Sequence, residues 1–239
     1  MKQWIKALFL GMLLFSTTAA QAVPLADLLD GGSITAGDKL FDSWQLLFYD
    51  SSEVGRTLDA GNIDVEALTT GNFGLRFSVT NDELSINGDG NYAYLDLMFG
   101  FRVSVLDPAW RIKDATLALM DGALTWNPDG TTDVGMYIQE KIGSAPEQDN
   151  RGQLAVEFSQ LDDAQFADLE AVLDVSALSE IWVTKNILVW AADQGDRANL
   201  LGIDQSFSQT QTVVPEPGTV TLMLLGVAGL VTARKKKWL

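Results

Sequence analysis

Hydrophobic and polar residues alternate along much of the chain, most clearly over residues 92–106. Every second residue of this run is apolar, and the residues between them include Asp96 and Arg102. Successive side chains of a strand point to opposite faces, so the pattern predicts a long strand with one buried face. Phe99 and Phe101 fall on that face and are expected to point inward.

Shorter runs with the same character occur throughout residues 23–213, separated by clusters of Asn, Asp, Gly and Pro. These clusters are typical of turns, and they lie at 87–90, 121–122, 127–130 and 194–196. About seven to nine strands joined in this way predict a mainly β protein, an antiparallel β-sandwich that is jelly-roll-like. The further strands are expected at 44–49, 63–68, 73–79, 112–120, 133–142, 154–159, 181–189 and 198–207.

One segment of this β-rich region favours a helix. Asp162 is followed three residues later by Gln165, which is the spacing of a capping box. Phe166 and Leu173 then recur at a spacing that places them on one helical face. The pattern predicts one short helix over residues 162–173, lying across the sheet.

The N-terminus has the pattern of a secretory signal. Two lysines precede an uncharged apolar stretch, and Ala20 and Ala22 are small residues of the kind that signal peptidase reads. The apolar stretch is too short to cross a bilayer core of about 30 Å, which argues against an uncleaved anchor. Residues 1–22 are therefore predicted to be a signal peptide, with Val23 as the mature N-terminus.

The C-terminus has the pattern of a membrane segment. Residues 217–233 carry no charge and are mostly apolar, and at about 1.5 Å rise per residue they suffice for a short transmembrane helix. Arg234, Lys235, Lys236 and Lys237 follow at once. Such a basic cluster stays on the cytoplasmic side, so the preceding domain is expected to lie outside the inner membrane.

Val214, Pro215, Glu216 and Pro217 stand directly before this apolar segment. The motif, the apolar segment and the basic cluster together resemble the PEP-CTERM sorting signal of Gram-negative bacteria that make exopolysaccharide. The resemblance covers residues 214–239 and implies processing by exosortase, a membrane protease-transpeptidase. It also implies an inner-membrane-anchored precursor with its domain on the periplasmic side, and a final place at the cell surface or in the extracellular matrix.

Three stretches of the exported domain also resemble ones common in exported PEP-CTERM proteins. They are residues 33–41 near the mature start, residues 183–187, and residues 205–209 just before the tail. This resemblance supports membership of that family of surface proteins. The function expected for this chain is a structural or adhesive role in an exopolysaccharide or biofilm context. It supplies no catalytic or ligand-binding residue for this chain.

Composition narrows the chemistry of the exported domain. The chain has no Cys and no His, which excludes a thiol nucleophile, thiolate metal sites and a Ser-His-Asp triad. Six of its 16 basic residues and one of its 32 acidic residues lie in the two end segments, so residues 23–214 carry a net charge of −21. Such a domain is not expected to bind nucleic acid. Paired carboxylates without a motif do not indicate a glycosidase, so no enzymatic activity and no catalytic residue are expected.

Calcium is the cofactor that an excess of carboxylates would favour. The Asn-x-Asp-x-Asn spacing around Asp89 begins like an EF-hand loop, but Tyr92 stands where its Gly is needed and Met98 where its Glu is needed. The EF-hand interpretation therefore fails and no metal ligand set is predicted. A different loop that uses Asp82, Glu83 or Asp89 keeps Ca²⁺ as an alternative.

The domain is also rich in tryptophan, with five such residues. Flat aromatic rings on a β-sandwich often bind sugars, whereas buried rings fill the core. The alternative to a structural role is therefore a non-catalytic module that binds carbohydrate, such as an exopolysaccharide, or Ca²⁺. Exposure of the rings would separate the two hypotheses. The tryptophans concerned are Trp44, Trp110, Trp126, Trp182 and Trp190.

Overall fold

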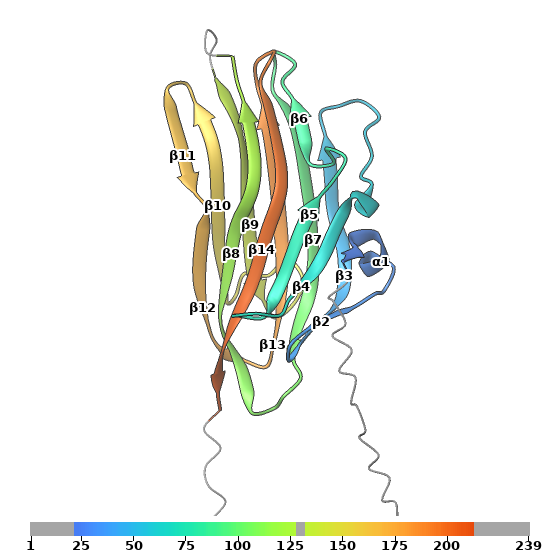
Figure 1. The fold of residues 1–239 in the computed structure, drawn as a ribbon, viewed down its shortest axis with the longest axis vertical. Helices are drawn as coiled ribbons and strands as arrows, with labels where there is room; N and C mark the ends of the chain where they lie inside the picture. The colour runs from blue at the N-terminus through green and yellow to red at the C-terminus, as the bar shows by residue number, and fades with distance from the viewer. Residues whose placement is uncertain (1–21, 128–131, 213–239) are drawn as a thin grey trace, which may run out of the picture.

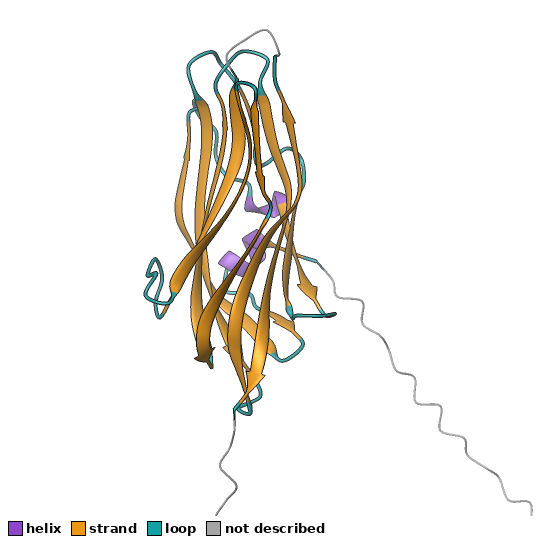
Figure 2. Cartoon of the chain, turned by 90° about the vertical axis from the view of Figure 1, so that its left-hand side faces the viewer, coloured by secondary structure: helices purple, strands orange, loops and turns teal. Residues whose placement is uncertain are grey.

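The alternating segments form strands that pair into two seven-stranded sheets, packed face to face (Figures 1 and 2). The computed structural model describes residues 22–127 and 132–212. The strands are β1 (Val23–Pro24), β2 (Ile34–Ala36), β3 (Lys39–Ser51), β4 (Ile63–Leu68), β5 (Gly74–Val79), β6 (Ser85–Asn87), β7 (Ala93–Val105), β8 (Trp110–Thr125), β9 (Asp133–Gly143), β10 (Gly152–Leu161), β11 (Ala164–Asp168), β12 (Glu170–Leu178), β13 (Glu180–Ala191) and β14 (Arg197–Gln211). A short helix α1 (Leu25–Leu29) and a 3-10 turn η1 (Ala60–Asn62) complete the described elements.

The first sheet has the strand order β1-β4-β5-β14-β8-β12, with β6 paired to β14. The second has the order β11-β10-β9-β13-β7-β3-β2. All pairings are antiparallel. The predicted antiparallel sandwich is confirmed, and the nine expected strands correspond to β3, β4, β5, β7, β8, β9, β10, β13 and β14.

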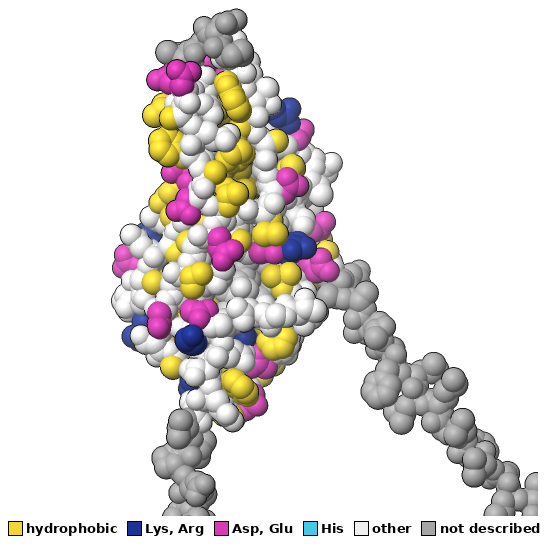
Figure 3. Space-filling model, turned by 60° about the vertical axis from the view of Figure 1, so that its left-hand side comes forward, with side chains coloured by type: hydrophobic (Ala, Val, Ile, Leu, Met, Phe, Trp, Pro, Cys, Tyr) yellow, Lys and Arg dark blue, Asp and Glu magenta, His cyan; other side chains and the backbone are white. Residues whose placement is uncertain are grey.

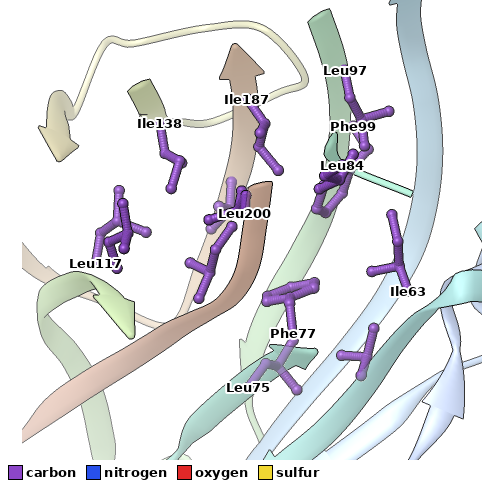
Figure 4. Close-up of a cluster of buried hydrophobic side chains, with 14 of the residues drawn as sticks. Ile63, Leu75, Phe77, Leu84, Leu97, Phe99, Leu117, Ile138, Ile187 and Leu200 are labelled. Atoms are coloured by element: carbon purple, nitrogen blue, oxygen red, sulfur yellow. The ribbon is translucent and has the colours of Figure 1, made fainter. Parts of the chain in front are cut away.

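The core lies between the two sheets and is richest in aromatic rings around β7. Phe99 and Phe101 are 1% and 0% exposed, as the alternation predicted. The Trp44 ring stacks on Phe101 with 4.5 Å between centroids, and Phe77 of the opposite sheet lies 5.6 Å from Phe99. Figure 4 shows side chains of both sheets meeting in this layer, among them Phe77, Phe99, Leu117, Ile138, Ile187 and Leu200.

The prediction of a helix over residues 162–173 is wrong, because this segment forms β11 and the start of β12. Asp162 does not cap a helix: its φ of 48° places it in the tight turn between β10 and β11. Gln165, the expected capping-box partner, pairs instead with Gln160 across that hairpin. The short helix of the fold is α1, at the start of the domain.

The turn predicted at Asp121 and Gly122 is also wrong, because both residues lie inside β8. The pairing of β8 with β14 shifts register around them. A Cβ on Gly122 would lie 2.6 Å from Met136 Sδ of the other sheet, so glycine here permits close packing rather than a chain reversal. The turn at 194–196 is confirmed, whereas most of the cluster at 127–130 lies outside the described residues.

Several predicted sites fall outside the described residues: Ala20, the sorting motif at 214–217 and the basic cluster at 234–237. Val23, the predicted mature N-terminus, lies in β1 and pairs with Val65. In the described part of the chain, no helix is both long and apolar enough to cross a membrane.

Candidate functional site

Three polar side chains meet in the middle of the otherwise apolar core. Glu140 of β9, Lys185 of β13 and Gln205 of β14 are each 0% exposed. Glu140 and Lys185 are direct cross-strand neighbours in one sheet, and Gln205 reaches them from the other. Charged groups are almost never fully buried unless they are paired, so this cluster, the polar triad, is the most unusual chemical feature of the domain.

Lys185 is the centre of the polar triad. Its Nζ donates a hydrogen bond to Glu140 Oε2 and another, of 2.6 Å, to Gln205 Oε1. The Nζ also lies 5.8 Å from the centre of the Phe77 ring. In contrast, Glu140 Oε1 and Gln205 Nε2 are buried without a partner at hydrogen-bond geometry among the described residues. The triad is therefore only partly satisfied, which is costly in an apolar core.

Burial governs the protonation of the polar triad. It raises the pKa of Glu140, and this effect exceeds the opposing attraction and hydrogen bond of Lys185 and the smaller opposing effect of the Gln205 side chain. It also lowers the pKa of Lys185, against the opposing charge of Glu140. Both shifts favour the uncharged forms, because a low-dielectric core disfavours ions. Burial therefore opposes ionisation of both groups, while the attraction between them favours it.

Sequence reasoning did not identify the polar triad, although a signal for it exists. Lys185 falls on the apolar phase of its strand, between Val183 and Ile187, and Glu140 falls likewise between Ile138 and Ile142. A charged residue at a position where the alternation demands an apolar one marks a buried polar site. The apolar residues on either side of both positions predict the strands but assign no role to the charged residues between them.

A second polar cluster lies where residues 33–41 meet residues 205–209. Gln209 Nε2 donates a hydrogen bond to Asp38 Oδ1, and Lys39 Nζ lies 3.3 Å from the same oxygen. Burial lowers the pKa of Lys39, opposed by Asp38. The cluster borders a hollow of about 200 Å³. Its lining residues are Lys39, Gly71, Asn72, Phe73, Phe207 and Gln209.

The structure does not bring the three candidate calcium ligands together. Asp82 binds Asn199 and Arg197, while Glu83 accepts hydrogen bonds from the Asp59 backbone N–H and another side chain. Asp89 accepts two backbone N–H bonds of its own turn, which lower its pKa. Across residues 22–127 and 132–212, no group of three or more acidic side chains is arranged to hold a metal ion.

The five tryptophans do not form an exposed row. Trp44 and Trp190 are buried, and Trp190 Nε1 donates a 2.6 Å hydrogen bond to Asp133. Trp110, Trp126 and Trp182 are half-buried. Trp44 lies in the core and Trp126 packs against it. The described rings therefore do not offer a flat sugar-binding platform.

The outer face of the second sheet nevertheless carries a shallow polar hollow of about 130 Å³. Beside it, Asn186 Nδ2 donates a 2.6 Å hydrogen bond to Asp96, whose pKa burial raises. The hollow is lined by Met98, Gln139, Lys141, Thr184 and Asn186. Amide, hydroxyl and ammonium groups of this kind are able to bind sugar hydroxyls, although no flat aromatic ring lines the hollow.

An exposed apolar patch covers the side of the sandwich where β10, β11 and β12 lie. Apolar side chains gather on the upper part of this side in Figure 3. A hollow of about 220 Å³ adjoins the patch and is lined in part by Phe158 and Leu169. The exposed members of the patch are Met120, Leu161, Phe166, Leu169 and Val172.

Comparison with known families identifies the end of the chain. Residues 213–237 match the PEP-CTERM protein-sorting motif. This confirms the resemblance drawn from the motif at 214–217, the apolar segment and the basic cluster. The motif implies an exported, membrane-anchored precursor that exosortase processes. No curated protein matches the chain.

Three solved structures are similar to this chain only at a low level. The enzymatically active domain of tailspike protein 4 of bacteriophage CBA120 is 10% identical, with a TM-score of 0.26 over 69% of this chain and 19% of its own length. TmCBM61, solved with β-1,4-galactotriose, is 11% identical, with a TM-score of 0.22 over 71% of this chain and 89% of its own. Endoglucanase 3 of Trichoderma harzianum, from family GH12, is 11% identical, with a TM-score of 0.24 over 70% of this chain and 97% of its own. Likenesses at this level carry no argument about function.

Proposed function

We propose that this protein is sorted by exosortase to the cell surface or extracellular matrix of a Gram-negative bacterium, where its β-sandwich has a structural or adhesive role in an exopolysaccharide or biofilm context. The sorting motif carries the proposal. It begins at residue 213, two residues after β14 ends at Gln211. The sandwich is thus joined almost directly to the segment that exosortase reads.

The processing steps follow from the end segments. Signal peptidase removes residues 1–22, and the apolar segment holds the precursor in the inner membrane with the sandwich on the periplasmic side. Exosortase then acts at or near Pro215, Glu216 and Pro217. Tryptophan rings that are buried or half-buried support a structural scaffold over a row of exposed sugar-binding rings.

Fractionation of cells that express the full chain with its exosortase tests this proposal. Replacement of Pro215, Glu216 and Pro217 by alanine should leave membrane insertion intact but prevent release to the surface. Neutral residues at 234–237 should instead impair orientation and retention before processing, because the positive cluster is lost. Lys113→Gln removes one exposed positive charge elsewhere and serves as the control. If both tail variants reached the surface like the wild type, the sorting proposal would be wrong.

A second candidate function is binding of exopolysaccharide at the polar hollow around Asn186. The observation that favours it is the cluster of amide, hydroxyl and ammonium groups on an open sheet face. A polysaccharide pull-down with the wild type and Asn186→Ala tests it, with the exposed turn variant Gln194→Ala as control. Retention by the wild type and the control, lost in Asn186→Ala, would support binding. Comparing Ca²⁺ with Na⁺ at equal ionic strength tests the calcium alternative in the same assay.

A further inference from the structure

We propose that Lys185 and Gln205 join covalently through an isopeptide bond across the core, in a reaction that Glu140 assists. All three side chains are fully buried and belong to three different strands. Lys185 Nζ already lies 2.6 Å from Gln205 Oε1, and this oxygen is bonded directly to the carboxamide carbon that the amine would attack. Reaction between groups fixed in contact avoids most of the entropic cost of a bimolecular step.

The amine of Lys185 is suited to act as the nucleophile. An ammonium group has no free electron pair, and only the neutral amine attacks a carbonyl carbon. Complete burial of Lys185 between the two sheets favours that neutral form. Burial lowers the pKa of Lys185 for the same reason. The core thereby favours the reactive form of the amine.

Glu140 is placed to transfer the proton. Its Oε2 contacts Lys185 Nζ, and its Oε1 is buried without a partner among the described residues. Burial raises the pKa of Glu140 and so favours its carboxylic acid form, which has one proton to give and one oxygen to receive another. Gln205 Nε2, the leaving nitrogen, likewise meets no partner at hydrogen-bond geometry.

The reaction is a balanced aminolysis of the carboxamide. A bond forms between Lys185 Nζ and the Cδ of Gln205, and the bond between that Cδ and Nε2 breaks. Glu140 receives one proton from the amine and gives its own proton to the departing nitrogen, which leaves as ammonia. No atom is oxidised or reduced, no co-reactant is needed, and Glu140 is restored to its starting form.

The product resolves the partly satisfied polar triad. The amine and the NH₂ group, both costly in the core, are replaced by one neutral secondary amide. The bond also ties β13 to β14, and hence one sheet to the other, over a loop of 20 residues. Under the proposed function, tension from the sorting segment enters the domain through β14, so the cross-link would resist separation of the sheets. The bond itself does not depend on that function.

Mass spectrometry of the purified full chain tests the proposal directly. Digestion with trypsin should give no cleavage after Lys185, and the peptide that contains it should be joined to the peptide beginning at Ala198. The joined species should weigh one ammonia less than the sum of its two parts. Separate, unmodified peptides from the wild-type protein would overturn the proposal, and this result needs no variant to fold.

Variants assign the three roles. Lys185→Met and Gln205→Leu should abolish the cross-link, and Glu140→Gln, which preserves size, should abolish or greatly slow it. Gln209→Leu is the matched control, because it removes a neighbouring carboxamide of β14 that binds Asp38. It should retain the full ammonia loss. A complete cross-link in Glu140→Gln would overturn the role of Glu140, and a complete one in Gln205→Leu would overturn the assignment of Gln205.

Discussion

Strand β7 and the segment at residues 161–178 are both rich in apolar residues, yet they occupy opposite kinds of position. β7 lies between β3 and β13 in the middle of a sheet, and Phe99 on its inner face is 1% exposed. In the other segment, β11 and β12 are each the edge strand of a different sheet, and Phe166 is 51% exposed. Apolar and polar residues alternate in a strand whose two faces differ in burial. An edge strand whose faces are equally exposed lacks this alternation.

The contrast explains why the edge segment resembles a helix in sequence. All five residues of β11 are exposed, so no burial constraint imposes alternation on them. Asp162 lies in the preceding turn and Gln165 lies in β11 itself, and their spacing of three residues coincides with that of a capping box. Where no burial pattern is present, a local pattern such as the capping-box spacing therefore determines which secondary structure the sequence predicts.

The largest expected effect lies at the centre of β7. Phe99→Ala should lower the free energy of unfolding by about 3–5 kcal/mol, because it leaves a cavity between the two sheets. Phe99 contacts rings of both sheets, including Phe77 and Trp44, so the cavity has little chance to collapse. Urea unfolding followed by tryptophan fluorescence measures the loss. A cost below about 1 kcal/mol would show that β7 is not the centre of the core.

Much of the fold was predictable from the sequence because burial is periodic in the central strands. The inward direction of Phe99 and Phe101 followed from alternation, and the sites of nine strands followed from apolar runs together with the turn clusters between them. The sorting segment at 213–237 was predictable because its order of motif, apolar run and basic cluster is specific. These signals are local and do not require knowledge of which strands become neighbours.

The polar triad was not predictable in the same way. Glu140, Lys185 and Gln205 come from strands separated by turns and belong to two sheets, so only the tertiary pairing shows that they meet. Each appeared merely as a polar exception within an apolar phase. The bulge near Gly122 was missed for a related reason, since the need for glycine arises from Met136 on the opposite sheet.

An intermediate effect is expected on the outer face of β7. Asp42 of β3 accepts two hydrogen bonds of 2.8 Å from Arg102, and these lower the pKa of Asp42. The ionised carboxylate therefore stabilises the fold above the unfolded-state pKa of about 4, and this contribution is lost as the pH falls through the lower folded-state value. Asp42→Asn should cost about 0.5–1 kcal/mol near neutral pH, because the pair is partly exposed.

Thermal melts across pH 2–7 check both the size and the sign of this effect, and Asp96→Asn is the matched comparison. Burial raises the pKa of Asp96, so its ionisation opposes folding as the pH rises through the folded-state value. Asp96→Asn should therefore cost little near neutral pH. Equal pH profiles for the two variants would contradict the assigned difference between Asp42 and Asp96.

The smallest expected effect lies at the edge, where Phe166→Ala should change the free energy of unfolding by about 0.5 kcal/mol or less. Half of the Phe166 side chain is already in water, and its strand has a sheet neighbour on one side only. Phe158 of β10 is the matched control, because it is partly buried against the core and should cost more when truncated. A helix packed on the sheet through Phe166 would instead make the two losses similar, at several kcal/mol. Urea titrations of both variants therefore distinguish an edge strand from the helix that the sequence pattern favours.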